Sequence, residues 1–197
     1  MPFFNHFDFI APYYDRVLSN HSMERLISLL ELNDCRGGVP PSLLLDVGGG
    51  TGRIAQALKG TVSSIIVADA SIGMLYQAAG KGDLYTICTL SEAMPFPPST
   101  FVRIIMVDAL HHVYNATRTA QELWRLLKPG GKIIIEEPDI RIFMVKLVAL
   151  AEKLALMRSH FLSPQDISRL FTSSNARTQI ERNGFSTFVI VEKCVAE

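Results

Sequence analysis

Short apolar runs and helix-like apolar repeats alternate along the middle of the chain. The runs have the length of buried strands, and between them apolar residues recur at intervals of three and four. This alternation is typical of right-handed βαβ units, so it predicts an α/β fold with a doubly wound, mostly parallel sheet and helices on both faces. The predicted strands are residues 43–47, 64–68, 85–89, 102–107 and 132–136, and the predicted helices are 54–58, 72–79 and 116–127.

The two ends of the chain carry different patterns. Helical repeats over residues 10–18 and 22–32 come before a loop that is rich in turn residues. Near the carboxyl end, Ser163 and Pro164 have the types expected at the N-cap and first position of a helix. Beyond them, the dipeptide at 183–184 is an Asn-Gly pair between two strand-like runs, which predicts a hairpin with a type I′ turn.

Composition narrows the class of protein. The chain has 197 residues, of which 48% are hydrophobic, and its 19 basic and 19 acidic residues cancel. A chain of this size forms a single domain with a substantial core, and a neutral chain lacks the charge for nonspecific binding to nucleic acid. Charged residues interrupt the apolar stretch 140–157, so no integral membrane segment is expected. With no leader pattern at the start and an odd number of cysteines, we expect a cytoplasmic protein.

Four glycines join the first predicted strand to the first predicted helix. Gly48, Gly50 and Gly52 have the spacing GxGxG, which permits a tight turn and a close approach of a ligand to the backbone. A nucleoside-containing cofactor fits such a loop. For Gly49, ordinary turn formation explains the residue as well as ligand contact does.

Two acidic residues extend this candidate site. Asp46 precedes the loop, where a carboxylate would repel a pyrophosphate but would tolerate an ammonium or sulfonium group. Asp69 ends the second strand run, about 20 residues farther on, at the position where an acid accepts hydrogen bonds from ribose hydroxyls. Alternatively, Asp69 is the N-cap of the helix that begins near Ser71.

Five segments in order along the chain resemble the motifs of class I S-adenosylmethionine-dependent methyltransferases, and in particular the group that includes the ubiquinone/menaquinone C-methyltransferases. The resemblance implies S-adenosylmethionine as the cofactor and a seven-stranded sheet of order 3-2-1-4-5-7-6 with an antiparallel last strand. It also implies one domain over 1–197, with 1–38 as a helical cap and 140–175 as a substrate cover. The five segments are residues 45–52, 67–71, 91–96, 107–112 and 126–132.

The resemblance also assigns residues to the cofactor. Gly48 and Gly50 would support its methionine part, Asp69 its ribose, and Asp46 would face its amino end. The amino-terminal element at 9–16 is similar to a family element that folds over the cofactor. Leu90 stands where many members carry an acid that binds the adenine amino group. Further cofactor candidates are Gly49, Gly52, Ala70, Met74, Ser91, Glu92, Asp108 and Tyr14.

Two adjacent histidines follow the fourth predicted strand, at the edge of the sheet where open α/β folds bind ligands. Histidine titrates near neutral pH, so His111 or His112 suits the removal of a proton from a methyl acceptor. Alternatively, both histidines only line the end of the strand. No third ligand lies at a useful spacing, so no metal is expected.

These features predict a methyltransferase that acts on a small-molecule acceptor, apolar or quinol-like. A nucleic-acid base is disfavoured, because the Asn/Asp-Pro-Pro-Tyr motif of base amine methylation is missing. A nicotinamide-dependent oxidoreductase and a noncatalytic S-adenosylmethionine-binding regulatory protein are the alternatives. An apolar helical stripe within 143–154 fits a core face, an apolar acceptor or a homodimer contact.

Overall fold

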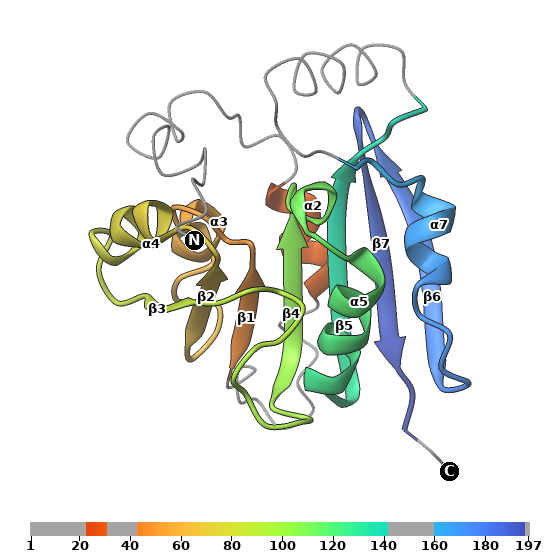
Figure 1. The fold of residues 1–197 in the computed structure, drawn as a ribbon, viewed down its shortest axis with the longest axis horizontal. Helices are drawn as coiled ribbons and strands as arrows, with labels where there is room; N and C mark the ends of the chain where they lie inside the picture. Colours follow the sequence, from red (N-terminus) through yellow and green to blue (C-terminus); the bar gives the residue numbers. More distant parts are fainter. Residues whose placement is uncertain (1–22, 31–42, 142–159, 196–197) are drawn as a thin grey trace.

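The computed structural model describes residues 23–30, 43–141 and 160–195, which contain a seven-stranded sheet (Figure 1). The strand order is β3-β2-β1-β4-β5-β7-β6, as predicted. The pairs β2–β3, β1–β2, β1–β4 and β4–β5 are parallel, and β7 runs antiparallel to β5 and to β6. The strands are β1 (Leu44–Val47), β2 (Ile65–Asp69), β3 (Tyr85–Cys88), β4 (Phe101–Val107), β5 (Leu127–Pro138), β6 (Ala176–Asn183) and β7 (Ser186–Lys193).

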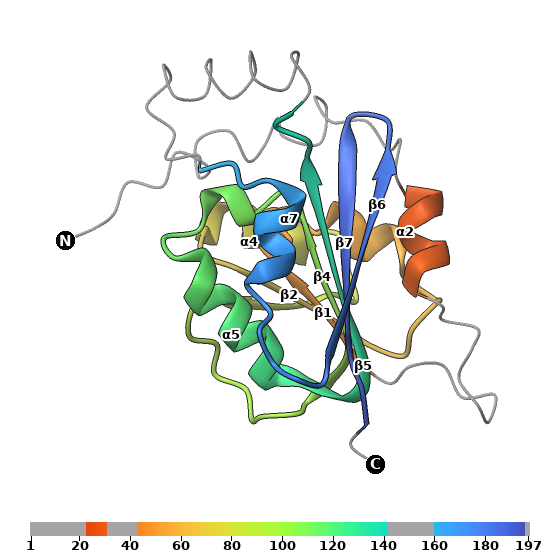
Figure 2. The same ribbon diagram turned by 90° about the vertical axis from the view of Figure 1, so that its right-hand side faces the viewer.

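Helices cover both faces of the sheet, with α5 and α7 on one side and α2 on the other (Figure 2). Because both faces are covered, β1 and β4 are apolar along most of their length instead of alternating. Leu44 packs in the core on the α2, α3 and α4 side, and its neighbour Leu45 packs in the core on the opposite side. The helices are α2 (Met23–Leu30), α3 (Arg53–Ala57), α4 (Ile72–Ala79), the 3₁₀ helix η1 (Leu110–His112), α5 (Ala116–Leu126) and α7 (Pro164–Arg169).

Side-chain caps fix the start of three helices. Ser71 accepts a hydrogen bond from the Met74 amide at the start of α4, so the N-cap there is Ser71 and not Asp69. Asn115 caps α5 in the same way. Ser163 caps α7, with Pro164 at its first position, as predicted. Each cap satisfies an amide that has no partner within its own helix.

Two local predictions are wrong. Asn183 pairs with Ser186, so the two-residue turn of the β6–β7 hairpin is Gly184-Phe185 and not Asn183-Gly184. Only Gly184 has a positive φ there, whereas a type I′ turn needs two such residues. In addition, the fifth strand was predicted to begin at residue 132, but β5 begins at Leu127. Phe101 of β4 pairs with Leu127, and the register between the two strands then shifts between Phe101 and Arg103. The predicted helix at 10–18 lies outside the described residues.

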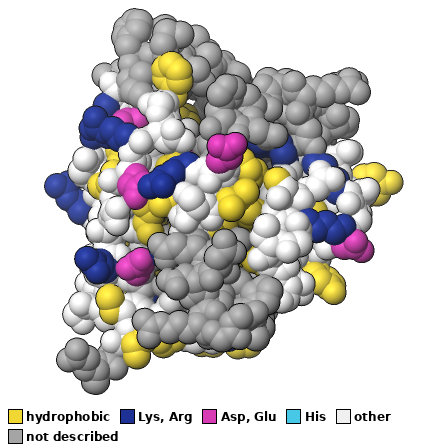
Figure 3. Space-filling model, turned by 180° about the vertical axis from the view of Figure 1, so that it is seen from behind, with side chains coloured by type: hydrophobic (Ala, Val, Ile, Leu, Met, Phe, Trp, Pro, Cys, Tyr) yellow, Lys and Arg dark blue, Asp and Glu magenta, His cyan; other side chains and the backbone are white. Residues whose placement is uncertain are grey.

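Within the described ranges, no helix is long and apolar enough to cross a membrane. On the face seen from behind, basic and acidic side chains are interspersed (Figure 3). This distribution fits the balanced charge of the chain, and the described side chains on that face form no large patch of one sign.

Candidate functional site

The glycine loop lies at the carboxyl end of β1, and three of its glycines have positive φ angles, of 66° at Gly48, 55° at Gly50 and 71° at Gly52. A Cβ added to Gly48 would lie 2.5 Å from the Cβ of Ala109, and one added to Gly49 would lie 2.6 Å from Cγ of Asp46. Gly49 is therefore required by packing. At Gly50 the nearest atom to an added Cβ would be Met74 Sδ, at 3.9 Å, so this backbone is open to a ligand.

Asp69 connects the glycine loop to the end of β2. Its Oδ2 accepts a hydrogen bond from the Gly50 amide at 2.9 Å, and its Oδ1 accepts one from the Ser71 amide at 2.8 Å. These two contacts fix the Asp69 carboxylate between the glycine loop and the start of α4. Asp69 is half-buried, and the adjacent Ala70 is exposed.

Asp46 lies beneath the loop and is only 1% exposed. The Ala55 amide of α3 donates a hydrogen bond to its carboxyl group, and Oδ2 has no partner among the described residues. Burial, and then the negative charge of Asp69, raise the pKa of Asp46 to about 7, against the opposing charge of Arg53. A carboxyl group with an unsatisfied buried oxygen is suited to a nearby cationic group.

Contacts of two other predicted cofactor residues, Ser91 and Glu92, connect them to α5. Ser91 contacts the Thr119 hydroxyl at 3.0 Å, and Glu92 Oε1 accepts a hydrogen bond from the Asn115 amide at 3.0 Å. These two contacts join the loop after β3 to α5. Met74, in contrast, is buried against the glycine loop. Asp108 directly follows β4 and has a positive φ of 54°, and Tyr14 lies outside the described residues.

Glu137, at the end of β5, holds the turn that contains the two histidines. Its Oε1 accepts hydrogen bonds from the amides of Ala109, at 3.0 Å, and Leu110, at 2.7 Å. Its Oε2 lies 2.5 Å from Nδ1 of His111. Glu137 was not among the residues predicted from the sequence. The signal that could have found it is an acid at the end of a buried apolar strand.

The two histidines have different environments. His111 is 3% exposed, and its ring stacks on Phe161 with centroids 4.3 Å apart and planes 13° apart. The ring of His112 lies 3.9 Å from that of His111. Burial, and then the positive charge of His111, lower the pKa of His112 to about 3, so His112 is neutral at physiological pH.

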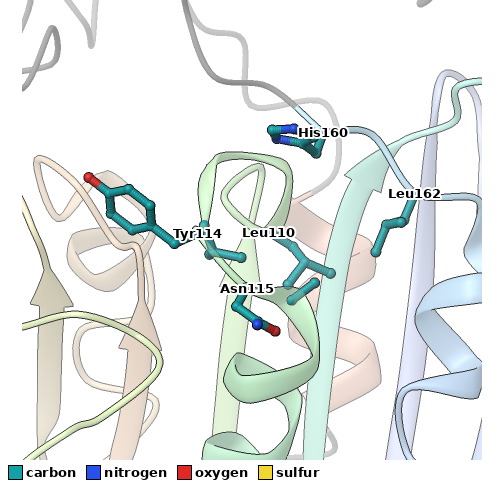
Figure 4. A pocket seen from close by; sticks show the side chains of 7 residues that line it. Leu110, Tyr114, Asn115, His160 and Leu162 are labelled. Carbon is teal, nitrogen blue, oxygen red and sulfur yellow. The ribbon is translucent and has the colours of Figure 1, made fainter.

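A pocket of about 290 Å³ lies beside this turn (Figure 4). Leu110 and Leu162 stand on opposite sides of it, whereas the ring of Tyr114 points away. The described lining includes no Asp, Glu, Lys or Arg. Among the described residues, no group of three His, Cys, Asp or Glu side chains could hold a metal ion. The lining residues are Leu110, Val113, Tyr114, Asn115, Ala116, His160 and Leu162.

Comparison with known proteins gives a consistent result. Residues 45–135 match the family model described as a methyltransferase domain. The chain is 30% identical over 114 residues to a ubiquinone/menaquinone biosynthesis C-methyltransferase of Vibrio cholerae, covering 53% of this chain and 44% of that protein. It is 31% identical over 135 residues to a demethylmenaquinone methyltransferase of Renibacterium salmoninarum, covering 66% of this chain and 56% of that protein. The chain thus spans about half the length of these relatives.

Solved structures share the fold at low identity. A putative methyltransferase of Haloferax volcanii, solved with a methyltransferase activator, has a TM-score of 0.78 at 14% identity, over 97% of this chain and 99% of that one. A possible histamine N-methyltransferase of Thermotoga maritima has a TM-score of 0.72 at 20% identity, over 95% and 98%. The [4+2]-cyclase SpnF also matches, with a TM-score of 0.74 at 15% identity, over 97% and 95%.

The cyclase in this set shows that the fold alone does not set the reaction, so the likeness to methyltransferases rests on the matched sequence together with the site. The matched residues 45–135 contain the glycine loop, Asp69 and the turn after β4. The strand order is the one expected for the family. Over residues 45–135, the chain therefore resembles the class I S-adenosylmethionine-dependent methyltransferases.

Proposed function

We propose that the chain binds S-adenosylmethionine at the glycine loop and transfers its methyl group to a small, neutral, apolar acceptor in the neighbouring pocket. One observation carries this proposal: the turn after β4 contacts the glycine loop and also lines the pocket. Ala109 packs against Gly48 of the glycine loop, and the next residue, Leu110, lines the pocket. Donor and acceptor would therefore meet across this turn.

The residues around the glycine loop fit the cofactor. Gly50 presents open backbone, the Asp69 carboxylate is held beside the Gly50 amide, and the buried carboxyl group of Asp46 suits a cationic amino end. When bound, S-adenosylmethionine supplies an electrophilic methyl group on a sulfonium. The protein's task is then to align the acceptor and exclude water.

The pocket supports an acceptor without formal charge. Its described lining is mostly aliphatic, and a charged ligand would lose its hydration there without an oppositely charged side chain. Its volume is close to the lower end of ordinary small-molecule pockets, roughly 300–1,000 Å³. Together with the names of the relatives, this favours the ring of a quinol-like aromatic as the group that enters.

Several finer assignments stay predictions. These are the proton-transfer role of His111 or His112, the homodimer, the cytoplasmic location, and the division into a cap at 1–38 and a substrate cover at 140–175. The described parts of that division are α2, which contacts β5, and α7, which contacts the β6–β7 hairpin.

Calorimetric titration with S-adenosylhomocysteine tests the cofactor assignment. Asp69→Ala removes the predicted ribose acceptor and also two hydrogen bonds to backbone amides. We expect it to weaken binding by about 1–3 kcal/mol, roughly 5- to 150-fold. Asp83→Ala is the matched control, because Asp83 lies on the surface in an ion pair with Lys59. An unchanged dissociation constant in Asp69→Ala would contradict the ribose assignment.

Two further measurements separate the alternatives. If NADH raises the melting temperature and S-adenosylhomocysteine does not, the chain is a nicotinamide enzyme. Methyl transfer to a demethylmenaquinol with a short prenyl chain, followed by mass spectrometry, tests the acceptor class. Tight cofactor binding without any product over a panel of neutral aromatic acceptors would favour the noncatalytic regulatory protein.

A further inference from the structure

We infer that Glu137 and His111 are positioning residues that hold the two walls of the pocket together. One wall comes from η1 and the start of α5, and the other comes from residues 160–162. The inference rests on the proposed function in one respect, that this pocket receives the acceptor. The contacts that carry it do not depend on which acceptor binds.

The first wall is tied to the sheet by Glu137. This carboxylate is buried and accepts from the amides of Ala109 and Leu110, while its second oxygen contacts His111 Nδ1. Three contacts with consecutive residues from one carboxylate fix both the path of the turn and the orientation of the imidazole. Hydrogen bonds to a charged group are stronger than neutral ones, and more so when buried.

The second wall is tied to the first by His111. The His160 amide donates a hydrogen bond to the His111 carbonyl oxygen at 2.7 Å, and the Phe161 ring stacks on the His111 imidazole. His160 and Leu162, on either side of Phe161, both line the pocket. The position of this wall therefore depends on His111, and the position of the His111 ring depends on Glu137.

The location of His111 favours a positioning role over direct contact with the acceptor. His111 is not among the described lining residues, whereas its sequence neighbour Leu110, which is equally buried, is among them. Its effect on the acceptor would be exerted through Leu110 on one side and through His160 and Leu162 on the other. A change at Glu137 should accordingly alter the fit of the acceptor more than the binding of the cofactor.

Hydrogen exchange at the His160 amide, measured by NMR on the full chain, tests the link between the walls. Glu137→Ala removes all three carboxylate contacts, and we expect exchange at this amide to accelerate at least tenfold. In Glu137→Gln the amide oxygen can still accept from Ala109 and Leu110, so a smaller acceleration is expected. His160→Ala is the matched control, because it changes the side chain but keeps the backbone donor, and its exchange should stay within about twofold of wild type.

Steady-state kinetics with the short-chain demethylmenaquinol separate positioning from proton transfer. We expect Glu137→Gln to raise KM for the quinol several-fold, with a smaller change in kcat, an unchanged pH profile, and an S-adenosylhomocysteine affinity within about twofold of wild type. Phe161→Leu, which leaves the Glu137 contacts in place, should reproduce the rise in KM and the faster exchange.

The outcomes are distinguishable. Unchanged exchange at His160 in both Glu137→Ala and Phe161→Leu overturns the inference. Loss of kcat together with loss of the acidic limb of the pH profile, at unchanged exchange, overturns it in favour of His111 as the proton acceptor. If wild type does not bind S-adenosylhomocysteine, the proposed function fails. The exchange result still decides whether Glu137 and His111 hold the two walls of the pocket together.

Discussion

At the scale of single residues, the ionisation of Asp46 departs strongly from the usual behaviour of an aspartate. Its carboxyl group is almost fully buried, and one of its oxygens has no partner among the described residues. Burial of this kind disfavours the ionised form of a carboxyl group. The nearby charge of Asp69 adds to this effect, and Arg53 and the Ala55 amide only partly offset it. The fold keeps such a group at the end of β1, beneath a loop that we propose binds a cationic cofactor.

This burial predicts a pH dependence of stability. Because the pKa of Asp46 is about 7 in the folded protein and 3.8 in a free side chain, the folded state holds a proton that the unfolded chain has released between these values. The contribution of Asp46 to the free energy of unfolding therefore falls as pH rises from about 4 to about 7, by on the order of 1 kcal/mol per pH unit. Asp46→Asn removes this slope.

Urea denaturation of wild type and Asp46→Asn at pH 5 and pH 7 measures the effect. Between the two pH values, wild type should lose about 2 kcal/mol more stability than the variant. Parallel stability profiles for the two proteins would show that Asp46 is ionised in the fold throughout this range.

At the scale of elements, the contact between the glycine loop and the turn after β4 decides where donor and acceptor meet. The sequence pattern predicted the strand, the loop and the following helix, because apolar period and glycine spacing are local properties. The pattern could not show that Gly48 must be glycine to admit Ala109, since the two lie 61 residues apart. It also misplaced the β6–β7 turn by one residue, because strand register depends on pairing with a partner strand.

A pair of glycine substitutions tests this contact. Gly48 and Gly60 both have positive φ angles, but an added Cβ meets Ala109 at Gly48 and nothing within 4 Å at Gly60. Gly60→Ala should cost about 1–2 kcal/mol from backbone strain alone. Gly48→Ala should cost more, because the overlap with Ala109 adds roughly 1–3 kcal/mol. Equal losses of stability in thermal denaturation would mean that the glycine loop can shift to accommodate the added methyl group without displacing Ala109 in the turn after β4.

At the scale of the whole molecule, the sheet joins two cores, one on each face, and the β6–β7 hairpin extends it beyond β5. Phe188 of β7 is fully buried in the core on the α2 side, whereas Phe185, in the hairpin turn, is 65% exposed. The hairpin therefore contributes directly to the core. Unfolding of the hairpin would therefore expose part of the core on the α2 side.

These two phenylalanines form a matched pair. Phe188→Ala should lower the free energy of unfolding by about 3–5 kcal/mol, because it removes buried surface and leaves a cavity. Phe185→Ala should change it by less than about 0.5 kcal/mol, as at an ordinary surface position. Chemical denaturation of both variants measures the difference. A small effect of Phe188→Ala would indicate that the hairpin is dispensable for the core.

The sequence by itself determined the class of fold and the glycine loop with Asp69, because these depend on local period, spacing and turn chemistry. The strand order was implied only by the resemblance of the motifs to a known family. Only the tertiary structure decided that Glu137 holds His111, that Phe161 stacks on the same ring, and that Asp46 is buried with an unsatisfied oxygen. The physical reason is that these states arise from contacts between residues of different elements that are not neighbours along the chain. Burial, pKa and orientation are set by neighbours in space, and the order of residues along the chain does not specify them.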